Sequence, residues 1–212
     1  CESAQERKQL EDELRAMVTP GSIDVNVMSK IDKNNFDADG NELPNGSDAV
    51  AAFRGFANSD LNSSIVFSAG YNPRLYNYIE QFADFFPDEK GHLKKKIILK
   101  VSDYRSALVQ GKILAKKGLW ISEFRIESGL NCGGHAFPTD GLLLGPILEE
   151  FKTKRDEIYS ELLQMCNASM AQNGNGSFTT LPTLRITVQG GIGTANEDNF
   201  LLEHYVLDGT GW

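Results

Sequence analysis

Histidine is the side chain best suited to acid–base chemistry near neutral pH, and the chain contains three: His92, His135 and His204. His135 ends the segment 131–135, with the sequence NCGGH, which follows a predicted strand. Two adjacent glycines let the backbone approach a flat ligand closely and present the imidazole as a base. The spacing alone leaves open whether His135 is a general base or an ordinary loop histidine. His92, in a glycine-containing turn, is expected to be solvated, and His204 is expected to begin a strand.

The cysteines could supply a nucleophile or a metal ligand, but their pattern argues against both. Cys132 lies three residues before His135, yet no third group that would orient the histidine is evident. A small residue that packs beneath the loop accounts for Cys132 better. Cys1, Cys132 and Cys166 form an odd set without CxxC spacing, so neither a disulfide framework nor a zinc site is predicted. We expect reduced thiols, as in the cytoplasm.

One acidic segment matches half of a calcium-binding loop. Asn35, Asp37, Asp39 and Gly40 fit the first half of such a loop, but Gly46 stands where the bidentate glutamate belongs. The segment is therefore predicted to form an Asp-Gly turn, and no metal site is expected.

The overall charge limits the partners of the protein. The 212 residues include 21 Lys and Arg against 29 Asp and Glu, which gives a net charge of −8. Nucleic-acid affinity comes largely from cations that neutralise phosphates, so a nucleic-acid partner is disfavoured. The basic run 94–96 precedes an apolar stretch and is predicted to be a solvated strand entrance. No apolar run approaches the ~18 residues of a membrane helix, so we expect a soluble, cytoplasmic protein without a membrane partner.

Strands and helices are predicted to alternate along the chain. Apolar runs and turn residues predict strands at 22–28, 64–69, 97–101, 119–126, 184–188 and 205–207. Helical spacing and capping residues predict helices at 3–17, 49–57, 72–86, 103–117, 146–170 and 196–202. Asn72 is expected to open the third of these helices and Asp103 to cap the fourth. A polar loop spans 30–48 and a glycine-rich loop spans 128–140. Such alternation indicates a parallel α/β fold, either a doubly wound sheet or a (β/α)8 barrel.

The glycines distinguish these two folds. The dinucleotide-binding pattern GxGxxG fails because Gly191-Ile192-Gly193 is followed by Asn196 at the position of the third glycine. Glycines at the ends of the last two strands are instead typical of phosphate sites in barrels. We therefore expect an α/β fold of the (β/α)8 TIM-barrel type. With six predicted strands in 212 residues, against eight strands in ~250 residues for a full barrel, residues 1–212 are expected to be a single partial barrel from a longer chain.

The order of these motifs resembles the nitronate monooxygenase family, once called 2-nitropropane dioxygenases. The resemblance rests on the strand and helix at 98–108, on Gly118 and on the segment 128–135. It continues in the turn Gln189-Gly190-Gly191-Ile192 and in Asp208-Gly209-Thr210, and the strand Val25-Asn26-Val27 resembles the family's G-V-N-L strand. The match is ordered and runs from about residue 21 to 212.

This resemblance implies an oxidoreductase that uses flavin mononucleotide (FMN). His135 would be the base that removes the acidic proton alpha to a nitro group, and dioxygen would reoxidise the reduced flavin. The substrate would be a small molecule, a nitronate or a similar small acid. The family pattern implies that the flavin contacts or is lined by Asn26, Lys100, Ser128 and Gly133, and that its phosphate is bound by Gly190, Gly191, Gly209 and Thr210.

Some positions depart from the family pattern and leave the substrate open. Asn131 replaces the family's glutamate, bulky Phe137 follows shortly after the histidine, and the polar loop 30–48 has no counterpart. Two alternatives remain. One is another FMN- or phosphate-binding barrel oxidoreductase, such as a glutamate synthase-like enzyme, and the other is a non-catalytic barrel module of a larger protein.

Overall fold

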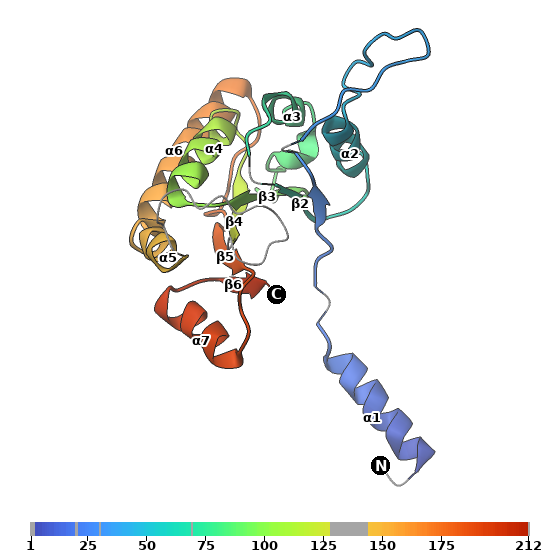
Figure 1. Ribbon diagram of the computed structural model, residues 1–212, viewed down its shortest axis with the longest axis vertical. Helices are drawn as coiled ribbons and strands as arrows, with labels where there is room; N and C mark the ends of the chain where they lie inside the picture. The colour runs from blue at the N-terminus through green and yellow to red at the C-terminus, as the bar shows by residue number, and fades with distance from the viewer. Residues whose placement is uncertain (1–2, 20, 30, 69, 128–143, 212) are drawn as a thin grey trace.

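A six-stranded parallel sheet forms the centre of the computed structural model, which describes residues 3–19, 21–29, 31–68, 70–127 and 144–211 (Figure 1). The strands are β1 (Val25–Val27), β2 (Ser64–Phe67), β3 (Lys96–Val101), β4 (Ile121–Glu127), β5 (Arg185–Gln189) and β6 (Gly209–Gly211). Their order in space is the same as their order along the chain. A doubly wound sheet would reverse its order at a switch point, so this sheet is singly wound over its six strands.

Helix α1 (Ala4–Met17) precedes β1, and the other helices connect successive strands. They are α2 (Asp48–Ala57), α3 (Pro73–Ile79), the 3-10 helix η1 (Ala83–Phe85), α4 (Tyr104–Ala115), α5 (Leu144–Thr153), α6 (Arg155–Asn173) and α7 (Ala195–His204). Connections of one hand between neighbouring parallel strands place the helices on one face of a sheet. Figure 1 shows α2, α3, α4 and α6 around one side of the sheet, whereas α1 projects away from the body and buries none of its residues. Within the described parts of the chain, no helix has the length and apolar character needed to cross a membrane.

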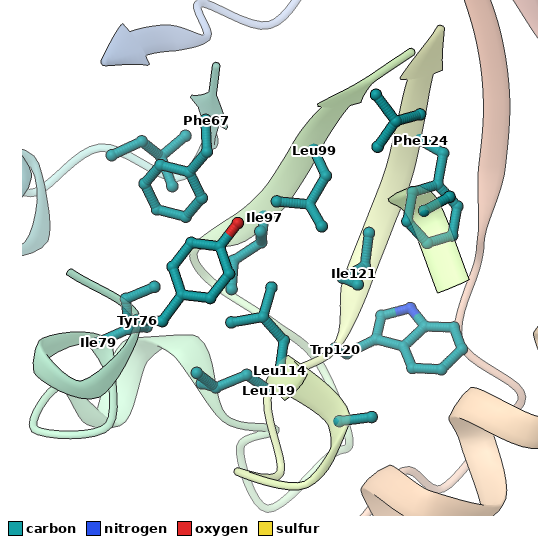
Figure 2. Close-up of a cluster of buried hydrophobic side chains, with 14 of the residues drawn as sticks. Phe67, Tyr76, Ile79, Ile97, Leu99, Leu114, Leu119, Trp120, Ile121 and Phe124 are labelled. Atoms are coloured by element: carbon teal, nitrogen blue, oxygen red, sulfur yellow. The ribbon is translucent and has the colours of Figure 1, made fainter. Parts of the chain in front are cut away.

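The core lies between the helices and the face of the sheet that they cover. Figure 2 shows its central side chains, which come from the strands, α3, α4 and the segment before β4. They are Phe67, Tyr76, Ile79, Ile97, Leu99, Leu114, Leu119, Trp120, Ile121 and Phe124, and each is at most 3% exposed. Burying a side chain of this size stabilises a fold by roughly 1.5–3 kcal/mol, so this face holds the sheet and helices together.

A register shift in β4 makes the other face of the sheet polar. Ile97 pairs with Ile121, but the next residue, Ile98, pairs with Glu123, so Ser122 is an extra residue of a β-bulge. Beyond the bulge Phe124 packs into the core. Alternation then directs Glu123, Arg125 and Glu127 to the face away from the helices.

Several local predictions are confirmed. Asn72 and Asp103 are helix N-caps, since the Asn72 side chain accepts a hydrogen bond from the Leu75 amide and that of Asp103 accepts one from the Ser106 amide. The polar loop contains the expected turn, in which Asp37 Oδ1 accepts hydrogen bonds from the amides of Asp39 and Asn41. In each case the side chain bonds to amides within four residues, so the local sequence is enough to predict the cap or the turn.

Two helices differ from their predicted lengths. The helix expected at 72–86 ends at Ile79 and is followed by η1. The helix expected at 146–170 is two helices, α5 and α6, with a break at Lys154. The Thr153 hydroxyl donates to the carbonyl oxygens of Glu149 and Glu150, a pattern that bends helices.

The strand expected at 205–207 was placed wrongly. Tyr205 caps α7, and Val206 has a positive φ of 55°, so this segment is not extended. The strand is Gly209–Gly211, which sequence propensity does not favour. His204 is consequently the last residue of α7 rather than the start of a strand, and its ring stacks on Phe200 with a centroid separation of 4.9 Å.

The basic run before β3 is only partly solvated, contrary to the sequence-based expectation. Lys95 is 0% exposed. Its Nζ donates to the carbonyl oxygens of Phe56, Ser59 and Leu61 at 2.9, 2.9 and 3.1 Å, and lies 4.5 Å from the centroid of the Phe56 ring. Burial lowers the pKa of Lys95, and the charge of Lys94 lowers it further. Lys95 thus ties the end of α2 to the start of β3.

We expect Lys95→Met to destabilise the protein by about 2–4 kcal/mol, because it removes the buried charged donor that joins the carbonyl groups of Phe56, Ser59 and Leu61. Lys94→Met is the matched control, since Lys94 makes only an exposed ion pair with Asp84 and should cost less than about 1 kcal/mol. Urea unfolding of both variants measures the difference. Equal losses would contradict the structural role of Lys95.

Candidate functional site

The carboxyl ends of β3, β4 and β5 bring three polar side chains together on the face away from the helices. Lys100 Nζ lies 2.9 Å from Glu127 Oε1, and the Gln189 amide nitrogen donates to the same oxygen at 2.7 Å. The Lys100 and Glu127 side chains are 13% and 18% exposed. Parallel strands present their carboxyl ends at one edge, where α/β proteins bind ligands. This partly desolvated group is the centre of the candidate site.

A second polar layer lies nearer the amino ends of the same strands. Glu123 is 4% exposed, and its Oε1 accepts hydrogen bonds from Thr187 Oγ1 at 2.7 Å and from Arg125 Nε at 2.8 Å. Its Oε2 lies 3.3 Å from Arg185 Nη1. Buried charges are tolerated when they are paired in this way. The layer fixes β4 and β5 beneath Lys100 and Glu127.

Asn26 occupies the same face two strands away. It is the middle residue of β1, pairs in register with Val66 of β2, and is exposed. Its neighbours Val25 and Val27 pack against the core, so Asn26 is directed to the face of Lys100. Since β2 separates β1 from β3, the two backbones lie roughly 10 Å apart. The structure therefore brings Asn26 to the candidate site, but not into contact with Lys100.

The turn after β5 has the backbone of a glycine turn. Gly190 and Gly191 have φ values of 82° and 77°, a region that side chains rarely adopt. The Gly190 amide donates to the Gly211 carbonyl oxygen at 3.0 Å. This turn runs directly into α7, whose N-cap is Thr194.

The donors around this turn already hold carboxylates of the chain. Glu197 Oε2 accepts from the Gly193 amide and from Thr194 Oγ1, both at 3.0 Å, and the Glu197 amide donates back to Thr194 Oγ1. The Thr210 hydroxyl donates to Asp198 Oδ1 at 2.6 Å. The hydrogen bond from Gly193 and those from Thr194 lower the pKa of Glu197. The donors at this turn are thus suited to an anion, and the Glu197 carboxylate occupies them.

Gly209 and Thr210 lie within β6 rather than beyond its end, contrary to expectation. Thr210 pairs with Val188, a core residue, and is therefore directed toward α7 and away from Lys100. Gly211 pairs with Gln189, and a Cβ at Gly211 would lie 2.9 Å from the Gln189 Cβ. Of the residues expected to bind phosphate, the structure groups Gly190 and Gly191 at the site edge and separates Thr210 from it.

Three expected site residues, Ser128, Gly133 and His135, lie outside the described residues. The sequence enters that segment directly after Glu127, which is part of the site. Within the described residues, no group of three or more histidine, cysteine, aspartate or glutamate side chains is placed to bind a metal.

Sequence analysis missed Glu127, Gln189 and a cavity beside the carboxyl ends of β1 and β2. The alternation of charged and apolar residues in β4 was the available signal for Glu127. The cavity has a volume of about 400 Å³. Its lining comes from two segments after different strands: Ser29, Asp32, Asn34, Tyr71, Asn72, Pro73 and Arg74.

The cap of α7 should make stability depend on pH. Because the pKa of Glu197 is lowered in the folded state, its contribution is present above the ordinary value of 4.5 and is lost as the pH falls through the lower folded value. We expect Glu197→Gln to lose less stability than the wild type between pH 6 and pH 3, measured by urea unfolding. Glu203→Gln, at the other end of α7, should respond like the wild type. Identical responses of the two variants would contradict the capping role.

The chain matches no family model, and no curated protein and no solved structure is significantly similar to it. The resemblance to nitronate monooxygenases therefore rests on the order of short motifs. The site must accordingly be interpreted from its own residues.

Proposed function

We propose that this chain belongs to a flavin-dependent oxidoreductase with a TIM-barrel type fold, which binds FMN and oxidises nitronates or similar small acids with dioxygen. The group Lys100–Glu127–Gln189 at the carboxyl ends of adjacent parallel strands carries the proposal. The strand order supports it, because a barrel is singly wound like this sheet.

The residues at the ring end suit a flavin. A flavin ring is flat and has carbonyl oxygens and ring nitrogens along one edge, which need hydrogen-bond donors. Lys100 and Gln189 supply donors from neighbouring positions of a partly buried face. Asn26 lies on the same face, about two strand spacings from Lys100. A flat ring lying across β1 to β3 could reach both.

The residues at the turn after β5, where the phosphate of the flavin would lie, suit an anion if Glu197 is displaced. The Gly193 amide and the Thr194 hydroxyl already bind the Glu197 carboxylate, so their chemistry is that of an anion site. A phosphate would have to displace Glu197 from these donors. Asp198, held by Thr210, adds a second negative charge close by.

The chemistry divides between the cofactor and the chain. A bound flavin would supply electron transfer from the substrate to dioxygen. In this proposal an imidazole nitrogen of His135 accepts the proton alpha to the nitro group. Lys100, which is held beside Glu127, would orient the ring edge, and the Glu123 layer holds β4 and β5 together beneath it. Positioning of this kind contributes to catalysis because the reacting groups need no rearrangement.

The alternative of a barrel module without a cofactor is favoured by the same turn. Glu197 and Asp198 occupy the donors that a phosphate needs. Another FMN- or phosphate-binding oxidoreductase, such as a glutamate synthase-like enzyme, would use the same site with a different reductant. A difference in flavin reduction by nitronates and by reduced nicotinamides would distinguish the enzymes.

FMN binding tests the proposal directly. We expect the full chain to retain added FMN through gel filtration and to show flavin absorption. Lys100→Met should weaken this binding by about tenfold or more, because it removes a charged donor from the ring edge. Lys96→Met, at the exposed amino end of the same strand, should bind like the wild type. A chain that stays colourless would refute the flavin and favour the module.

The base has its own test. We expect His135→Asn to retain FMN but to lose nitroalkane oxidation, measured as oxygen uptake, by about 100-fold or more, the usual scale of general-base catalysis. The preformed nitronate lacks the proton, so its oxidation should fall less. Unchanged turnover of the nitroalkane would exclude His135 as the base.

A further inference from the structure

The cavity beside β1 and β2 lies at the edge of the sheet that carries the candidate site. Ser29 follows β1 directly after Met28, and Tyr71 to Arg74 follow β2 and enter α3. The register of β1, β2 and β3 brings the ends of these strands level with Lys100. The cavity is open to solvent, and its volume of about 400 Å³ admits part of a small organic molecule against its walls.

Hydrogen bonds hold the base of the cavity in one arrangement. The Ser29 amide donates to Ser68 Oγ at 2.8 Å, and the two hydroxyl oxygens are 3.0 Å apart. The Asn72 amide nitrogen donates to the Ser29 carbonyl oxygen at 3.1 Å, while its oxygen caps α3 at Leu75. Ser29, Ser68 and Asn72 are all buried. The two segments are thus fixed relative to each other without a ligand, which favours binding.

Asp32 belongs to this frame and is not a free acid in the cavity. Its Oδ1 accepts from the Ala49 amide at 2.9 Å, and its Oδ2 accepts from Ser47 Oγ at 2.9 Å and from the Asn72 amide nitrogen at 3.1 Å. Burial raises the pKa of Asp32, but these hydrogen bonds and the charge of Arg74 outweigh it and lower the pKa overall. The Asp32 oxygens are therefore held by donors of the chain, while the charge of Asp32 also attracts Arg74.

Arg74 and Tyr71 give the mouth of the cavity a cation and an aromatic surface. Arg74 Nη1 donates to Asn34 Oδ1 at 2.5 Å and lies 3.6 Å from Glu42 Oε1, and its side chain is 44% exposed. Within the described residues its Nε and Nη2 have no hydrogen-bond partner among the side chains and carbonyl groups. Tyr71 is 49% exposed and rests edge-on against Tyr76, with ring centroids 5.3 Å apart.

We propose that this cavity binds the anionic end of a small organic acid. The charge of such a ligand is spread over two oxygens, as in a carboxylate or a nitronate, and pairs with the Arg74 guanidinium. A guanidinium presents parallel N–H groups that match two oxygens of one planar group. The apolar part of the ligand packs on the Tyr71 ring. In a chain with a net charge of −8, an anion needs a local cation of this kind.

The identification of this ligand as the substrate rests on the proposed function. The binding itself does not, because none of the residues of the cavity is expected to contact the flavin. The polar loop 31–47 supplies Asn34 and Glu42 beside Arg74.

Benzoate is a stable probe for the cavity, because it has a carboxylate and an aromatic ring. We expect calorimetric titration of the full chain to show one site for benzoate. Arg74→Gln should weaken this binding by ~10-fold or more, as expected for loss of a charged hydrogen bond. Tyr71→Leu should weaken it less. Arg15→Gln on the projecting helix α1 removes the same charge far from the cavity and should leave the affinity unchanged.

The outcomes separate this inference from the proposed function. Benzoate binding that depends on Arg74 in a chain that retains no FMN would support the cavity and refute the flavin. FMN retention together with no benzoate binding, or with equal binding by wild type and Arg74→Gln, would overturn the cavity. Inorganic phosphate that binds at Arg74 more tightly than benzoate would also overturn it, because the ring would then contribute nothing.

Discussion

The bulge at Ser122 is the constraint on which the rest of the molecule depends. Without this extra residue, the alternation begun by Ile121 would direct Glu123 into the core and Phe124 to the opposite face. One inserted residue therefore decides whether charged groups lie among the helices or on the free face of the sheet. With the bulge, the core face is apolar and Glu127 reaches Lys100. The register of β4 therefore determines both the packing of the core and the geometry of the candidate site.

The polar face is stable because its charges are paired in layers. Glu123 is held by Thr187, Arg125 and Arg185, and Glu127 is held by Lys100 and Gln189. Buried ion pairs add little net stability compared with apolar packing, and loss of one partner is costly. Desolvation of these charges therefore costs free energy that apolar side chains would not cost. This cost is consistent with a role of the group Lys100–Glu127–Gln189 in positioning a ligand.

Local features were predictable from the sequence, and long-range ones were not. The apolar runs of β2 to β5 and the caps Asn72 and Asp103 depend on a few neighbouring residues, so they could be identified. The burial of Lys95 depends on carbonyl groups of Phe56, Ser59 and Leu61, more than 30 residues earlier. No pattern near Lys95 indicates those partners. Likewise, the glycine-rich β6 has no strand propensity of its own and forms because β5 offers it an edge.

The residues of the candidate site also separate into those with local signals and those that depend on long-range contacts. Asn26, Lys100, Gly190 and Gly191 are selected through the family resemblance, which compares short local motifs, whereas the partners Glu127 and Gln189 emerge only when the strands are aligned. The motifs also do not show the charges that surround a site. Around the turn after β5, glycines and hydroxyl groups match an anion site, but Glu197 and Asp198 place two negative charges there.

The cavity at Arg74 has a different balance, since it offers a guanidinium as well as two carboxylates, Asp32, which three donors already hold, and Glu42, 3.6 Å from Arg74. A mobile anion therefore meets a cation at Arg74, whereas the donors at the turn before α7 are a neutral amide and a neutral hydroxyl. The two proposed anion sites thus differ in what they require. The turn must release Glu197 from its donors before it binds a phosphate, whereas at the cavity a small organic acid competes with Glu42 for the guanidinium.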